Sequence, residues 1–136
     1  MTESILRARD LVIGYETPLT QALNFHVGPG EILVVLGESG CGKSTLLSTL
    51  SGITRPLSGE ILLGEKCLSG VPIHRRNIGL VFQDPLLFPH LSLLDNIGYS
   101  LRAQGKTKKE ARERAAELLE WVGLSDVTGN KTWELS

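Results

Sequence analysis

The chain has 136 residues, of which 41% are hydrophobic and 21% are charged, and its formal net charge is −1. This composition is typical of a folded globular domain and excludes a disordered chain. The near-zero charge argues against a nucleic-acid partner. The chain opens without the basic flank and apolar run of a signal peptide, and no apolar run is long enough to span a bilayer. A role at a membrane would therefore have to pass through a partner.

The cysteine content indicates the compartment. Cys41 and Cys67 are the only cysteines, and neither lies in a CxxC pattern or beside a histidine. This pattern predicts neither a disulfide framework nor a metal site. A reducing, cytoplasmic setting is therefore expected.

The N-terminal part predicts strands followed by a helix. Residues 4–13 and 20–27 have the pattern of two short strands, which together form a small antiparallel element. Residues 32–36 are apolar on both faces, as expected of a strand buried between helices in a parallel sheet. Residues 44–51 carry leucines at helical spacing, and Gly52 is expected to end this helix.

The middle of the chain adds further strands. Residues 58–63 and the region near Cys67 predict short strands, and residues 77–82 predict another, mostly apolar one. The sequence therefore predicts the α/β class. Residues 1–87 are expected to form an α/β core with the antiparallel element, and residues 88–136 the start of a helical subdomain.

The C-terminal third predicts two capped helices. Ser92 begins the first, which is expected to end at Gly105, and Thr107 with Glu110 forms a capping box for the second, which is expected to end at Gly123. The apolar residues at helical spacing in the first helix are Leu93, Leu94, Ile97 and Leu101. Those in the second helix are Ala111, Ala115, Leu118, Leu119 and Val122.

Residues 37–45, G-E-S-G-C-G-K-S-T, form the strongest motif of the chain. They match G-x-x-x-x-G-K-[ST] between a predicted buried strand and a helix, the context of a phosphate-binding P-loop. Glycines let successive N–H groups face phosphate oxygens, and the helix N-terminus adds partial positive charge. Lys43 is expected at the β- and γ-phosphates and the Ser44 hydroxyl on Mg²⁺. The predicted nucleotide-binding residues here are Gly37, Glu38, Ser39, Gly40, Cys41, Gly42, Lys43, Ser44 and Thr45.

The whole chain resembles the nucleotide-binding subunits of ABC transporters, most closely those of importers. The resemblance rests on the P-loop wording, on Tyr15 in G-Y-E-T, on Gln83 in L-V-F-Q-D-P, and on Leu135-Ser136 as the start of L-S-G-G-Q. It implies that ATP and Mg²⁺ are bound, that Tyr15 stacks on adenine, and that Gln83 reaches Mg²⁺ and the attacking water. Lys43 and Gln83 are then the catalytic residues. The alternative for Tyr15 is a half-buried aromatic that only packs.

The resemblance also implies partners. Two such subunits close head to tail on ATP, and the closure moves transmembrane permease subunits from the cytoplasmic face of the membrane. The apolar stretch Leu87-Phe88-Pro89 is the expected permease contact, because exposed apolar patches mark interfaces. The alternative is that Leu87 and Phe88 pack under the helical part.

The match at Leu135-Ser136 stops inside the signature, and the family's Walker B segment, catalytic glutamate and switch histidine would follow it. The interpretation is a chain truncated within the signature motif that binds ATP and is hydrolysis-deficient alone. Two other interpretations stay open. One is a soluble P-loop phosphotransferase, such as a small-molecule kinase, with residues 106–120 as its lid. The other is an ABC ATPase without a transport role.

Overall fold

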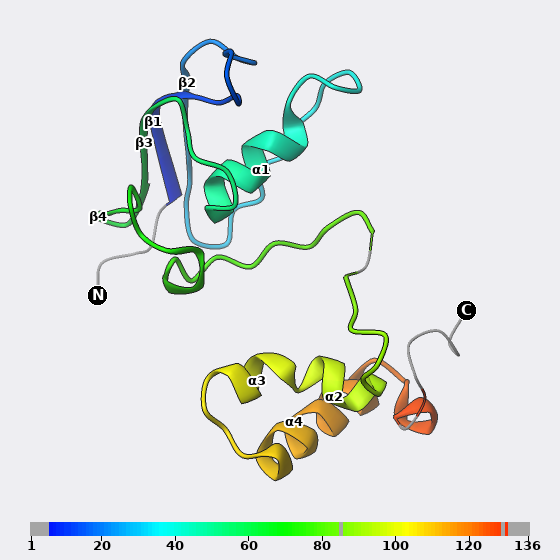
Figure 1. The fold of residues 1–136 in the computed structure, drawn as a ribbon. Coiled ribbons are helices and arrows are strands. Elements are labelled where there is room, and N and C mark those ends of the chain that lie inside the picture. The colour runs from blue at the N-terminus through cyan, green and yellow to red at the C-terminus, as the bar shows by residue number, and fades with distance from the viewer. Residues whose placement is uncertain (1–5, 85, 129, 131–136) are drawn as a thin grey trace. The chain divides into compact units, whose positions relative to one another are not determined.

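The computed structural model describes residues 6–84, 86–128 and 130 (Figure 1). Leu135 and Ser136 of the predicted signature lie outside the described residues. The chain divides into two compact units, Met1–Val81 and Phe82–Ser136. Each unit is described by itself below.

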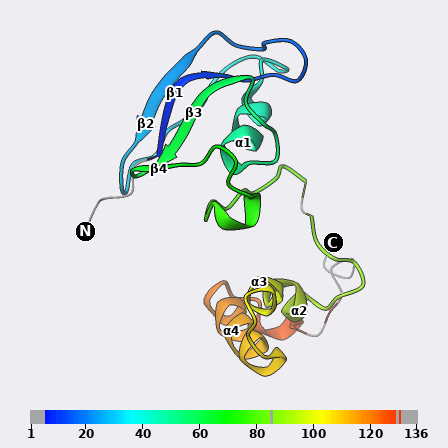
Figure 2. The same ribbon diagram turned by 60° about the vertical axis from the view of Figure 1, so that its left-hand side comes forward.

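The first unit is built on a four-stranded antiparallel sheet with the order β2-β1-β3-β4 (Figure 2). Its strands are β1 Leu6–Val12, β2 Leu23–Val27, β3 Ser58–Leu63 and β4 Lys66–Cys67. In the register, Leu6 lies opposite Val27 on one side and Leu63 on the other. The four short strands predicted here are confirmed, and the antiparallel element is larger than expected because β3 and β4 join it.

Helix α1, Lys43–Ser51, lies against this sheet (Figure 2). Leu46 and Leu50 are buried in one apolar cluster with residues of β1, β3 and their neighbours, namely Ala8, Leu11, Ile13, Ile61 and Leu68. Gly52 ends the helix at φ 95°, in the left-handed region that glycine tolerates, and its N–H donates to the carbonyls of Ser48 and Thr49. The predicted helix and its stop are both confirmed.

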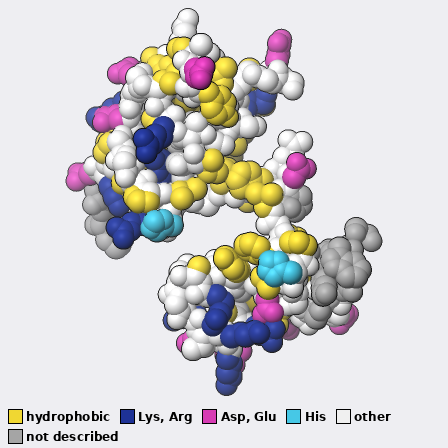
Figure 3. All heavy atoms as spheres, in the orientation of Figure 1, with side chains coloured by type: hydrophobic (Ala, Val, Ile, Leu, Met, Phe, Trp, Pro, Cys, Tyr) yellow, Lys and Arg dark blue, Asp and Glu magenta, His cyan; other side chains and the backbone are white. Residues whose placement is uncertain are grey.

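Two predicted buried strands do not form. Residues 32–36 and 77–82 have no strand pairing within the described part of the chain, and Ile32 and Val81 are 89% and 94% exposed. A buried strand of a parallel sheet needs hydrogen-bonded neighbours at its edges and helices on its faces. The described residues form no strand pairing with these segments, so most of their large apolar side chains are exposed, while Ile78 packs partly against the core of the first unit. Figure 3 shows that hydrophobic side chains reach the surface of the molecule.

The second unit is helical (Figure 1). Its helices are α2 Leu93–Ile97, α3 Tyr99–Ala103 and α4 Lys108–Trp121, followed by a short 3₁₀ turn at Ser125–Val127. The first predicted helix is thus split at Gly98, where glycine is about 1 kcal/mol less favourable in a helix than alanine. Gly98 also sits close to α4, because an added Cβ would lie 3.0 Å from the carbonyl oxygen of Ala111.

The caps of these helices follow the sequence prediction. The Ser92 hydroxyl accepts from the Asp95 N–H at 3.1 Å, and Thr107 and Glu110 form a complete capping box. The buried residues of α4 are Ala111, Ala115 and Leu119. Leu118 and Val122 were expected in the same apolar stripe but are exposed, so the buried face of α4 is narrower than predicted. No helix among the described residues has the length and apolar character needed to cross a membrane.

Candidate functional site

The P-loop folds tightly before α1. Gly40 and Gly42 have φ values of 83° and 99°, where a side chain would be strained. The Cys41 N–H donates to the Glu38 carbonyl at 3.4 Å, and the Leu46 N–H donates to the Gly42 carbonyl at 2.8 Å. Residues 37–45 therefore pass directly from a turn into the first helical turn.

Lys43 places its charge on this loop. Its ammonium donates to the Gly37 carbonyl at 2.7 Å and to the Glu38 carbonyl at 2.5 Å, and lies 3.6 Å from Cys41 Sγ. The side chain is half-buried. The ammonium therefore stays next to the start of the helix instead of extending into solvent.

The first turn of α1 is open to an anion. Gly42 gives it no side-chain cap, and its first turn contains no acidic residue. The leading N–H groups of a helix have no intrahelical acceptor and carry its partial positive charge. Together with the Lys43 ammonium, these amides fit a polyphosphate, and the exposed Ser44 hydroxyl is a suitable ligand for a hard cation.

Tyr15 lies on a turn next to the same end of α1. The turn is closed by a hydrogen bond from the Leu19 N–H to the Ile13 carbonyl at 2.8 Å. A Cβ added to Gly42 would lie 3.6 Å from Ile13 Cδ1 and 3.8 Å from Leu19 Cβ, so the structure brings this turn to the P-loop. Tyr15 itself is 71% exposed, which does not support the packing alternative.

The other predicted site residues belong to the second unit. Gln83 is exposed in the segment that precedes α2. Leu87, Phe88 and Pro89 are exposed in the same segment. The Phe88 ring lies 4.5 Å from that of Tyr99, centroid to centroid, so Phe88 rests on α3 without entering a core.

Asn96 holds this segment in place, and its role was not predicted from the sequence. Its Oδ1 accepts from the Phe88 N–H at 2.8 Å, and its Nδ2 donates to the Phe88 carbonyl at 3.0 Å and to the Ser92 carbonyl at 3.1 Å. Asparagine readily bonds to nearby backbone groups. The signal available in the sequence was therefore an asparagine within a predicted helix, where this residue type is unfavourable unless its side chain bonds to nearby backbone groups.

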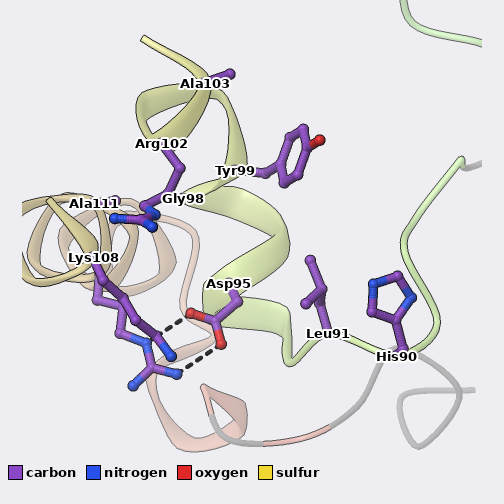
Figure 4. Close-up of a pocket in the computed structure, with 10 residues that line it drawn as sticks. His90, Leu91, Asp95, Gly98, Tyr99, Arg102, Ala103, Lys108 and Ala111 are labelled. Atoms are coloured by element: carbon purple, nitrogen blue, oxygen red, sulfur yellow. Dashed lines mark hydrogen bonds and ion pairs between the residues drawn. The ribbon is translucent and has the colours of Figure 1, made fainter. Parts of the chain in front are cut away.

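A pocket of about 480 Å³ lies within the second unit (Figure 4). One wall holds a two-pronged ion pair, in which Arg112 Nε and Nη2 each donate to an Asp95 carboxylate oxygen at 2.7 Å. These hydrogen bonds lower the pKa of Asp95 from 3.8 to about 2, although partial burial acts to raise it. Arg112 lies in the 106–120 segment, and its pairing with Asp95 joins α4 to α2 within the second unit.

The chain is similar to known proteins over most of its length. The ABC transporter family matches residues 20–136. The Fe(3+) ions import ATP-binding protein FbpC 1 of Rhizobium meliloti is 45% identical over 114 residues, which are 84% of this chain and 32% of that protein. FbpC of Agrobacterium fabrum gives the same figures.

A second kind of relative covers the chain completely. The spermidine/putrescine import ATP-binding protein PotA of Legionella pneumophila is 36% identical over 137 residues, 100% of this chain and 38% of that protein. The chain therefore spans between 32% and 38% of the length of these relatives. The family match includes the P-loop and extends over far more than half of the sequence, and the chain therefore belongs to the ABC transporter family of P-loop NTPases.

Proposed function

We propose that this chain is the ATP-binding part of the ATPase subunit of an ABC importer, which couples ATP binding and hydrolysis to transport across a membrane. The observation that carries the proposal is the uncapped first turn of α1 with the Lys43 ammonium held beside it. The importer assignment is supported by relatives named for import. Their names give different substrates, Fe(3+) ions and spermidine/putrescine, so no substrate is assigned to this chain.

The proposed nucleotide site combines the loop with two residues outside it. The phosphates of ATP take the open amides of α1, and Lys43 places its charge at the β- and γ-phosphates. Tyr15, exposed beside the same end of α1, stacks on adenine. Ser44 and Gln83 hold Mg²⁺, and Gln83 also orients the attacking water. Mg²⁺, when bound, offsets the charge that develops on the phosphates.

The proposed partners are a second nucleotide-binding subunit and the transmembrane permease subunits, on the cytoplasmic face of the membrane. Leu87, Phe88 and Pro89 form the permease contact. The support is their exposure together with the backbone hydrogen bonds from Asn96, which give the patch a fixed shape. For the 136-residue chain alone we propose nucleotide binding without turnover, because the resemblance assigns no general base to its residues. Phosphate release above background would contradict this point.

The test of the proposed function is ATP affinity in the Lys43→Ala variant. A fluorescent ATP analogue is titrated with Mg²⁺ present, and the variant is expected to bind at least about tenfold more weakly, since a charge-assisted contact is lost. Lys66→Ala is the matched control, because Lys66 is an exposed lysine of the same unit, in β4. Equal affinity in the two variants would overturn the phosphate assignment.

A further inference from the structure

A second pocket, of about 540 Å³, lies within the first unit. It is formed by the segment that follows α1, by Ile61 of β3, and by the loop that runs from Leu68 to Arg76. It therefore lies at the C-terminal end of α1, whereas the P-loop is at the N-terminal end. No residue of the predicted nucleotide site lines it.

The charged residues that line this pocket are Arg55 and Arg76, and no carboxylate lines it. Arg76 is only 7% exposed. Neither arginine has a carboxylate partner among the described residues. The wall of the pocket therefore carries a net positive charge. One of the two charges, that of Arg76, is shielded from bulk water, and its attraction for an anion is stronger there than at an exposed site.

Arg76 is fixed by backbone carbonyls. Its Nε donates to the Val71 carbonyl at 3.0 Å, and its Nη1 donates to the carbonyls of Thr49 and Leu50 at 3.3 and 3.2 Å. The latter two belong to the last turn of α1, and the Thr49 carbonyl also accepts from the Gly52 N–H at 3.2 Å. These bonds hold the guanidinium in one orientation and use only two of its three nitrogens.

The third nitrogen, Nη2, remains available. Among the described residues no hydrogen bond engages it. Arg76 itself lines the pocket. A carboxylate or phosphate oxygen there would meet a preoriented donor.

The rest of the wall is largely apolar. Besides the two arginines it includes Pro56, Ile61, Leu68, Val71, Pro72 and Ile73. Ligand pockets of a few hundred Å³ with mainly apolar walls and a few convergent polar groups suit small organic molecules. The chemistry of this wall matches a ligand with one anionic group and an apolar body.

We propose that this pocket is a binding site for a small organic anion. The anionic group, a carboxylate or a phosphate monoester, lies at Arg55 and Arg76, and the apolar body lies on Val71 and Ile73, whose side chains are more exposed than those of Ile61 and Leu68. The proposal does not depend on nucleotide binding at the P-loop, and it can hold or fail independently of the proposed function.

The test is titration of the 136-residue chain by calorimetry, with octanoate and octyl phosphate as probes. Octanol has the apolar body without the charge, and inorganic phosphate has the charge without the body. At least one of the two amphipathic anions is expected to bind, more tightly than octanol or inorganic phosphate and less tightly as ionic strength rises. Which of the two binds better distinguishes a carboxylate from a phosphate ligand.

Arg55→Gln is the informative variant, because Arg55 is exposed and its loss spares the bonds of Arg76. It is expected to weaken binding about three- to tenfold. Arg75→Gln is the matched control, since Arg75 is an exposed arginine that does not line the pocket. Unfolding curves of both variants without ligand, and shifts of the Gly70 and Val71 amide resonances on titration, separate lost binding from lost folding.

Three results would overturn the proposal. The first is octanol binding as tightly as the anions, which would leave only an apolar surface. The second is an equal loss in Arg55→Gln and Arg75→Gln, which would indicate general electrostatics. The third is the absence of both heat and amide shifts with either anion.

Discussion

The first turns of α1 and α4 satisfy their free amide groups in different ways. In α4 the Thr107 hydroxyl accepts from the Glu110 N–H at 3.2 Å, and the Glu110 carboxylate accepts from the Thr107 N–H at 2.8 Å. In α1 the corresponding position is Gly42, which has no side chain to offer, and the first turn holds a lysine and no acid. The helix start that serves only the fold is closed by its own side chains, and the one in the candidate site is left open.

Gly42→Asp is expected to give the largest loss of ATP affinity, because it adds a capping side chain to the start of α1, as Thr107 does in α4. The new carboxylate would compete for the amides and repel phosphate. We expect ATP affinity to fall by at least about a hundredfold, measured by titration of a fluorescent analogue.

Gly42→Ala is the control for the backbone. Both variants carry the same strain at φ 99°, and the added Cβ meets nothing closer than 3.6 Å in either case. The difference in affinity between Asp and Ala therefore measures competition for the amides. If the two variants bind ATP equally, the open amides are not the phosphate site.

Tyr15→Ala is expected to weaken ATP binding by about 1–3 kcal/mol, the scale of base–aromatic stacking. Tyr15→Phe should cost little, because the ring face makes the contact. Tripolyphosphate, which has no base, should bind to wild type and Tyr15→Ala alike. A loss of affinity for tripolyphosphate would mean that Tyr15 shapes the loop and does not contact adenine.

Thr107→Ala addresses the closed helix start. It removes the cap of α4 and is expected to lower the free energy of unfolding by about 1 kcal/mol, measured by denaturant titration of the helical circular dichroism signal. ATP affinity should not change. An effect on ATP affinity of the size seen for Gly42→Asp would contradict the division between a structural and a functional helix start.

The sequence predicted features that depend on neighbours in the chain. Ser92, Thr107 and Gly52 were assigned as caps because a cap needs only residues a few positions away. The P-loop was recognised for the same reason, since its glycines and Lys43 act within one short stretch. These are the parts of the fold and the site for which local hydrogen bonding decides the structure.

Features that depend on distant residues were missed or wrong. The Asp95–Arg112 pair joins α2 to α4 across 17 positions, and no local pattern marks it. The buried strand predicted at residues 32–36 does not form, for a related reason. The apolar character of a segment indicates that burial is favourable, but it does not identify the distant residues that would cover the segment. Likewise, no local pattern indicates that Arg76 is buried against the end of α1.

The Asp95–Arg112 pair gives the smallest expected effect. The folded-state pKa of Asp95, about 2, lies below the ordinary value of 3.8. Its contribution to stability is therefore complete above pH 3.8 and is lost as the pH falls through about 2. Asp95→Asn is expected to lower the free energy of unfolding at neutral pH by less than about 1 kcal/mol, because the pair is partly exposed.

The difference in unfolding free energy between wild type and Asp95→Asn should shrink as the pH falls from 3.8 to about 2, measured by urea titration at each pH. Glu113→Gln, which removes a carboxylate 3.9 Å from Lys109 on the same helix, is the control. A constant difference between wild type and Asp95→Asn down to pH 2 would show that the ion pair is not its source, leaving the Ser92 hydroxyl bond to Asp95 as the remaining contact.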